Sequence, residues 1–128
     1  MVKYADSIVG RIRKKVQDLG LAENTLILFT GDNGSGKGLV SEMSDGMIVR
    51  GGKGSNHQNG IHVPLIGLWE GKVVPGQVSD ELVDFSDFLP TFTDLARYSL
   101  PSGLVTDGHS LAPIFTGEGE RKKDYVYM

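Results

Sequence analysis

The chain has 128 residues, a net charge of −3 and no cysteine. This length is enough for one domain with a modest hydrophobic core. The small negative charge without a long basic run argues against binding of nucleic acid or anionic membranes, and no apolar stretch approaches the roughly 20 residues of a membrane span. Disulfides, thiolate metal sites and a cysteine nucleophile are excluded.

Residues 4–19 are predicted to form an amphipathic helix. Apolar side chains recur there at helical spacing, at Ile8, Val9, Ile12, Val16 and Leu19. Gly20 fits the left-handed position that ends a helix. No capping box precedes this helix, which we interpret as a sign that the chain is cut from a longer protein.

Two apolar runs, residues 25–30 and 63–71, are predicted to be strands. Continuous apolar runs are typical of parallel strands that helices cover on both faces. Between them, residues 31–60 are rich in glycine and are expected to be mostly loop, with a short extended piece at residues 47–50.

A second helix is expected over residues 86–98, with Ser86 or Asp87 as its N-cap and Pro90 in its first turn. Residues 125–128 resemble the opening of another strand. The order helix, strand, long loop, strand, helix, loop and strand predicts an α/β fold with a parallel sheet, in a single domain that spans residues 1–128.

Residues 31–37 follow the pattern Gly-x-x-x-x-Gly-Lys, as in a nucleotide-binding phosphate loop. Such a loop requires serine or threonine next, to hold Mg²⁺, but the next residue is Gly38. No helical pattern follows, although the phosphate loop uses a helix N-terminus. A flexible glycine loop with an incidental Lys37 is therefore favoured over a nucleotide site.

Asp32 and Asn33 lie directly beyond the first predicted strand. Ligands of open α/β sheets bind beyond the carboxyl ends of strands, and neighbouring carboxylate and amide oxygens suit hard cations such as Ca²⁺ and Mg²⁺. A simple turn at Asn33-Gly34 is the alternative, and the local sequence alone favours it.

Lys53 stands between two glycines, so that its backbone can approach a ligand closely. The compact, strongly hydrated ammonium group of lysine suits an oxyanion. A solvated surface lysine is the alternative.

Four segments extend these observations: "YADSIVGRIRKKVQDLGLAENTLILFTGDNG", "RGGKGSNHQNGIHVPLIGLWEGK", "DFSDFLPTFTDLA" and "DGHSLAPIFTG". In this order, over nearly the whole chain, they resemble the C-terminal part of the catalytic domain of a type I sulfatase, in the alkaline phosphatase-like superfamily. The resemblance implies a parallel-sheet domain flanked by helices, of which this chain is a C-terminal fragment. It also implies a full-length protein that hydrolyses sulfuric esters.

The resemblance assigns roles to three residues. Asp32 and Asn33 correspond to calcium ligands, and Lys53 corresponds to a lysine that binds the sulfate group and takes part in catalysis. Lys37 has no role in the family, so the resemblance makes the phosphate-loop pattern a coincidence of glycines around a metal-binding turn.

Some positions depart from the family pattern. His62 stands where many members have arginine and others have histidine, Gln58 where an acidic residue is usual, and Asn59 where a small residue is usual. These changes affect the walls of the pocket more than the chemistry. His57 and His109 are expected to be loop residues rather than ligands.

The family nucleophile is a formylglycine, made from cysteine or serine in a C/S-x-P-[SA]-R motif. Residues 99–103, "SLPSG", mimic it, but Gly103 replaces the arginine and the segment follows the Asp-Asn-Gly turn instead of preceding it, so we interpret it as a loop. Ca²⁺ takes 6–8 oxygen ligands, and this turn offers two. We therefore expect the chain alone to be inactive, and the formylglycine to lie in the missing N-terminal part.

Two alternatives remain open: a phosphodiesterase or phosphatase of the same superfamily, and a non-catalytic binding domain with this fold. Under the sulfatase hypothesis the substrate is a sulfated small molecule or polysaccharide, and the sequence does not distinguish between them. Exposed sheet edges of a fragment favour self-association. Family analogy points to a periplasmic or secreted protein.

Overall fold

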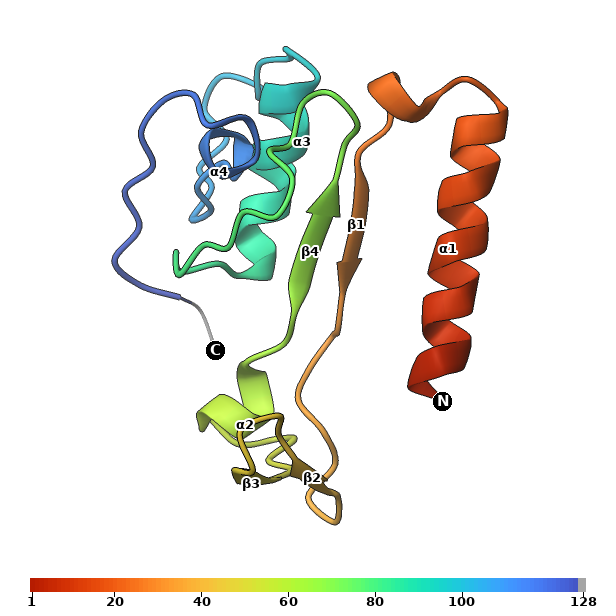
Figure 1. The fold of residues 1–128 in the computed structure, drawn as a ribbon. Coiled ribbons are helices and arrows are strands. Elements are labelled where there is room, and N and C mark those ends of the chain that lie inside the picture. Colours follow the sequence, from red (N-terminus) through yellow and green to blue (C-terminus); the bar gives the residue numbers. More distant parts are fainter. Residues whose placement is uncertain (127–128) are drawn as a thin grey trace. The chain divides into compact units, whose positions relative to one another are not determined.

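The computed structural model describes residues 1–126 (Figure 1). The described residues divide into two compact units, the first formed by residues 1–26 and 68–126, and the second by residues 27–67. Within the described residues, no helix has the length and apolar character that crossing a membrane requires.

The first unit begins with α1, Val2–Asp18, which confirms the predicted N-terminal helix. Gly20 has a φ of 69°, as expected for the residue that ends a helix. Part of the apolar stripe is open to solvent: Ile8 and Ile12 are 38% and 51% exposed, whereas Val9 and Val16 are half-buried. The short 3-10 helix η1, Ala22–Asn24, follows, and Trp69 holds it: Trp69 Nε1 donates to the carbonyl oxygen of Glu23 at 2.7 Å.

The second predicted helix forms as the 3-10 turn η2, Phe85–Asp87, continued by α3, Phe88–Leu95. Asp87, one of the two predicted N-caps, is the N-cap of α3, but its side chain makes no capping hydrogen bond to that helix. The side-chain cap lies one turn earlier, at Asp84 before η2, whose carboxylate accepts the Ser86 N–H at 2.8 Å. The Asp87 carboxylate accepts the Asp84 N–H in return, which completes a capping box. Arg97, with a φ of 55°, lies beyond the end of α3, so the helix stops before residue 98.

The core of the first unit joins α3 to the segment that precedes α4, Ala112–Thr116. Asp87 and Thr91 are fully buried, and Leu111 is 1% exposed. The Leu111 N–H donates to Thr91 Oγ1 at 2.8 Å, and the His109 N–H donates to Asp87 Oδ1 at 2.8 Å. Two of the four sequence segments singled out above therefore hold each other in place.

A group of four charged residues, here called the Asp87 cluster, attaches the C-terminal segment to this core; it comprises Asp84, Asp87, Arg121 and Lys123. Lys123 Nζ lies 2.7 Å from Asp87 Oδ1 and 2.8 Å from Asp84 Oδ2. Arg121 Nη2 lies 2.9 Å from Asp87 Oδ2. Each charge in the cluster is paired, as buried charges must be.

The pKa of Lys123 reflects this surrounding. Burial is the largest single influence and lowers the pKa, because it disfavours the charged form. The hydrogen bonds and negative charges of Asp84 and Asp87 act in the other direction and together outweigh burial. The pKa of Lys123 is therefore raised above its ordinary value.

This raised pKa predicts how stability depends on pH. The contribution of Lys123 is fully present below about pH 10.4, the unfolded pKa of lysine, and is lost as the pH rises through the folded pKa. We expect the difference in unfolding free energy between wild type and Lys123→Met to stay constant at neutral pH and to shrink only in stronger alkali. Denaturant unfolding across pH measures it, and a difference that shrinks well below about pH 10 would contradict the assignment.

The second unit contains two pairs of strands, of which only Leu68, the last residue of β4, falls in the first unit. β1, Ile27–Thr30, pairs with β4, Leu65–Leu68, and their arrows run in opposite directions in Figure 1. β2, Val40–Glu42, and β3, Ile48–Arg50, form an antiparallel hairpin. The strands predicted at 25–30 and 63–71 are confirmed, as is the extended piece at 47–50.

Sheets of two strands are too small to show the parallel sheet expected from the sequence, so that arrangement stays a prediction for the full-length protein. β2 and the one-turn helix α2, Gln58–Ile61, were not predicted. The strand predicted at 125–128 is not present at residues 125–126, and its last two residues lie outside the described part of the chain.

Candidate functional site

Asp32 and Asn33 form a bend immediately after β1. The side chain of Asp32 is exposed and that of Asn33 is half-buried. Within residues 1–126, no hydrogen bond or ion pair engages either side chain. One carboxylate and one amide oxygen are therefore free to bind a ligand.

The glycine after this bend is needed for a close backbone contact. Gly34 donates its N–H to the carbonyl oxygen of Gly60 at 2.9 Å. A Cβ atom at residue 34 would overlap the carbonyl oxygen of Asn59. Its φ is outside the left-handed region, and no hydrogen-bonded turn forms at Asn33-Gly34. The Asn-Gly turn considered from the sequence is thus replaced by a contact with the α2 segment.

The backbone of Lys53 is hydrogen-bonded to the segment that follows the Asp32-Asn33 bend. Its N–H donates to the carbonyl oxygen of Ser35 at 2.9 Å, two residues after Asn33. The neighbouring Gly52 is buried and donates its N–H to the carbonyl oxygen of Asn59 at 3.2 Å. The side chain of Lys53 is exposed. The second unit thus holds the backbone of Lys53 beside the segment that follows Asp32 and Asn33.

The phosphate-loop pattern does not form a phosphate loop. Lys37 and Gly38 lie in a turn, and the next element is the strand β2. A phosphate loop needs a helix at this point, whose N-terminus binds the phosphate groups. The nucleotide hypothesis is therefore wrong, and Lys37 is an exposed loop residue.

The three histidines lie at two places: His57 and His62 at the ends of α2, and His109 in a loop of the first unit. His57 and His62 are exposed. His109 is half-buried in the first unit, where its ring contacts Tyr125 edge to face with ring centroids 6.1 Å apart. In the described part of the chain, no group of three or more His, Cys, Asp or Glu side chains is arranged to hold a metal.

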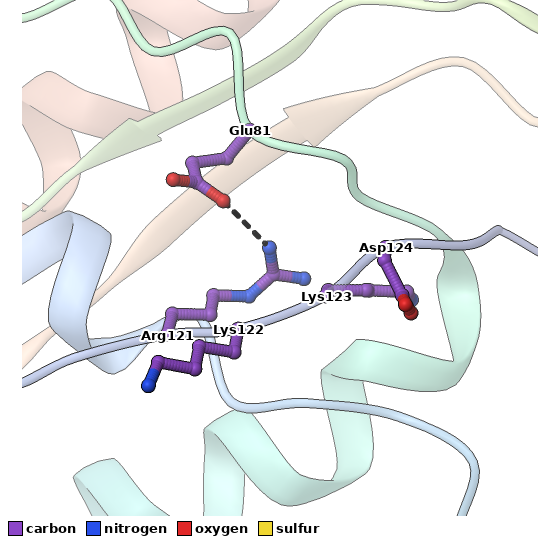
Figure 2. Close-up of a pocket in the computed structure, with 5 residues that line it drawn as sticks. All are labelled: Glu81, Arg121, Lys122, Lys123 and Asp124. Atoms are coloured by element: carbon purple, nitrogen blue, oxygen red, sulfur yellow. Dashed lines mark hydrogen bonds and ion pairs between the residues drawn. The ribbon is translucent and has the colours of Figure 1, made fainter.

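A hollow of about 510 Å³ lies in the first unit, away from these residues in the sequence (Figure 2). Its lining comprises Glu81, Arg121, Lys122, Lys123 and Asp124. Figure 2 shows Glu81 directed at the guanidinium group of Arg121, with Nη1 and Oε2 3.4 Å apart. Since Arg121 and Lys123 are already paired with Asp87, the two buried cations of this hollow act in structure rather than in binding.

The Asp87 cluster is the main feature that the sequence reading missed. The pattern Asp-x-x-Asp at residues 84–87 is a local signal for the capping box. Nothing local signals the pairing with Arg121 and Lys123. The segment "SLPSG" forms a turn at Ser102 and Gly103, as expected for a loop.

Comparison with known proteins identifies the family. The model of the sulfatase family matches residues 1–98. The chain belongs to the sulfatase family. Similar proteins include arylsulfatase A of Homo sapiens, 35% identical over 123 residues, and steryl-sulfatase of Homo sapiens, 38% identical over 133 residues. The uncharacterized sulfatase YdeN of Escherichia coli (strain K12) is 37% identical over 134 residues.

The sulfatase relatives are much longer than this chain. The matches cover 96%, 99% and 99% of the chain but only 24%, 22% and 22% of these three relatives. The chain thus spans about a quarter or less of the length of these three sulfatases. Its mixture of helices and strands is compatible with an alkaline phosphatase-like fold.

Proposed function

We propose that this chain is the C-terminal part of the catalytic domain of a formylglycine-dependent sulfatase. In this proposal Asp32 and Asn33 contribute calcium ligands, and Lys53 binds the sulfate group. The observation that carries it is the hydrogen bond from the Lys53 N–H to the Ser35 carbonyl oxygen, which holds the lysine segment beside the Asp-Asn bend.

The two residues of the bend suit Ca²⁺. Their carboxylate and amide oxygens are hard donors, and neither side chain is engaged within the described residues. When bound, Ca²⁺ polarises the sulfate oxygens and lowers the energy needed to generate the nucleophile. Because Ca²⁺ takes 6–8 ligands, other parts of the full-length protein supply the rest, and we propose that this chain alone is inactive.

Lys53 has two roles in the proposal. Its ammonium group binds the sulfate anion through a charge-assisted hydrogen bond, which orients the ester. The same charge stabilises the negative charge that develops as the S–O bond breaks. The exposed side chain can reach a ligand, while the backbone is held by Ser35.

A sulfated small molecule is the substrate class to test first. Two of the similar proteins are named arylsulfatase A and steryl-sulfatase, which supports sulfate esters of small organic molecules for this chain as well. A sulfated polysaccharide remains the second class. No observation favours the phosphatase or the non-catalytic alternative.

Calcium dependence tests the proposal directly. The full-length protein, co-expressed with a formylglycine-generating enzyme, is expected to hydrolyse 4-nitrophenyl sulfate, to lose this activity in EDTA and to regain it with Ca²⁺. Asp32→Ala should raise the calcium concentration needed for half-maximal activity by at least roughly 10- to 100-fold, the range seen for residues that only support a metal ligand. Asn33→Ala should have a smaller effect, because its oxygen is uncharged.

Glu42→Ala is the matched control, since Glu42 is an exposed carboxylate on the neighbouring hairpin. Its calcium dependence should equal that of wild type. Turnover that is insensitive to EDTA would refute the calcium site, and unchanged calcium dependence in Asp32→Ala would refute the residue assignment. Hydrolysis of 4-nitrophenyl phosphate without hydrolysis of the sulfate would favour the phosphatase alternative.

A further inference from the structure

Asn59 occupies the centre of the backbone contacts around Lys53. It lies in α2 and is half-buried. Its carbonyl oxygen accepts the Gly52 N–H at 3.2 Å, and its Nδ2 donates to the carbonyl oxygen of Arg50 at 2.8 Å. Arg50 and Gly52, which both lie shortly before Lys53 in the chain, are thus hydrogen-bonded to Asn59.

Asn59 also contacts both halves of the candidate site. A Cβ atom at Gly34, directly after the Asp-Asn bend, would overlap the carbonyl oxygen of Asn59. A Cβ atom at Gly52, directly before Lys53, would overlap its Oδ1. The side chain of Asn59 therefore fills the space that the missing side chain of Gly52 leaves.

The Oδ1 atom of Asn59 is buried and has no hydrogen-bond partner within the described residues. Leaving a buried acceptor unpaired costs free energy. The amide is nevertheless held in this orientation, because turning it over would replace the Nδ2 donor facing Arg50 by an oxygen. Asn59 thus keeps its Oδ1 atom, a buried acceptor without a partner among the described residues, beside Gly52.

We propose that Asn59 is a positioning residue, which holds Lys53 at a fixed place relative to the Asp32-Asn33 bend. The proposal rests on the function proposed above. Glycine is the most mobile residue of the backbone, so that a segment with Gly51, Gly52 and Gly54 around Lys53 needs an external contact to keep one conformation. A small residue at position 59, as the sulfatase pattern usually has, cannot supply the side-chain part of this contact.

Hydrogen exchange tests the positioning without using activity. In the full-length protein, Asn59→Ala should make the Gly52 and Lys53 amides exchange about tenfold faster than in wild type, because the segment loses its side-chain support. Asn56→Ala is the matched control, since Asn56 is exposed in the same loop, and should leave the exchange unchanged. Exchange that is equally slow in Asn59→Ala would overturn the proposal.

Kinetics test the consequence for catalysis. For 4-nitrophenyl sulfate, Asn59→Ala should lower kcat about three- to tenfold, as expected for the loss of one hydrogen bond, with little change in KM and in the thermal midpoint. Unchanged kcat would overturn the functional half of the proposal. A wild-type protein without turnover would refute the proposed function instead, and the exchange result would still decide on Asn59.

A second substitution makes the test specific for the contact. Gly52→Ala alone should lower kcat strongly, because the added Cβ overlaps Asn59 Oδ1. In the Asn59→Ala background the same change should have a much smaller effect, since the overlapping atom is absent. Additive effects of the two substitutions would show that residues 52 and 59 act independently and would contradict the proposal.

Discussion

Replacing Asp87 by alanine is expected to leave the full-length protein largely unfolded. The Asp87 carboxylate accepts hydrogen bonds from Arg121 and Lys123 and from the N–H groups of Asp84 and His109. Removing one partner of a buried ion pair costs about 3–5 kcal/mol, because the other charge is left buried and unpaired. Two buried cations would each lose an ion pair here, so that among the described residues Lys123 keeps only the ion pair with Asp84 and Arg121 keeps only the longer contact to Glu81. The unfolding free energy of a domain is only about 5–15 kcal/mol.

The loss would spread through the first unit. Asp87 is the last residue of η2, directly before α3, and it holds the segment before α4 by accepting the His109 N–H. Without it, the capping box, the link to α4 and the attachment of the C-terminal segment are all weakened. The soluble yield and the thermal midpoint of the full-length protein measure the effect.

Asp124→Ala is the control for this prediction. Asp124 is an exposed carboxylate one residue after Lys123, and its removal should change the unfolding free energy by no more than about 0.5 kcal/mol. Asp87→Asn combined with Lys123→Met should be less harmful than Asp87→Asn alone, because it removes one cation together with the anion. A folded Asp87→Ala protein with a wild-type midpoint would show that the cluster does not stabilise the fold.

The elements that the sequence predicted correctly are those whose signal is local. The stripe that runs from Ile8 to Leu19 has helical spacing, and helix α1 forms where this stripe lies. The apolar runs of β1 and β4 are equally local. The short elements β2, α2 and α4 have only 3, 4 and 5 residues, too few to show a hydrophobic period in the sequence.

The Asp87 cluster could not be predicted for a physical reason. Asp87 and Lys123 are 36 residues apart in the sequence, and nothing in the intervening chain specifies that they meet. The local part of the same feature was predicted in part: Asp87 is the N-cap of α3, as one of the two predicted residues, but the capping box that begins at Asp84 was not predicted.

The candidate site shows the same division. From the residues alone, Asp32 and Asn33 were better explained as a turn, and only the family resemblance assigned them to calcium. The glycines of residues 31–60 predicted a loop, which is correct in outline. A side chain at residue 34 or residue 52 would overlap Asn59, which explains why both residues are glycine. The sequence could not show this reason.

Substitution of Lys53 is expected to have the largest effect on activity. Lys53→Ala should lower kcat for 4-nitrophenyl sulfate about 10²- to 10³-fold, the loss seen when one preorganised donor to a developing negative charge is removed. Lys53→Arg should recover only part of this loss, because a planar guanidinium group does not occupy the position of a compact ammonium group. Steady-state kinetics of the full-length protein at saturating Ca²⁺ measure both variants.

Lys37→Ala separates this role from a general effect of losing a positive charge. Lys37 is an exposed lysine of the same glycine-rich segment, and it lies in the turn before β2. Its removal should leave kcat close to the wild-type value, because Lys37 is an exposed loop residue outside the proposed site. Equal losses in Lys37→Ala and Lys53→Ala would assign the effect to the charge of the loop. Unchanged turnover in Lys53→Ala would remove Lys53 from the catalytic site, while membership of the sulfatase family would stand, because it rests on the match over residues 1–98 and not on this side chain.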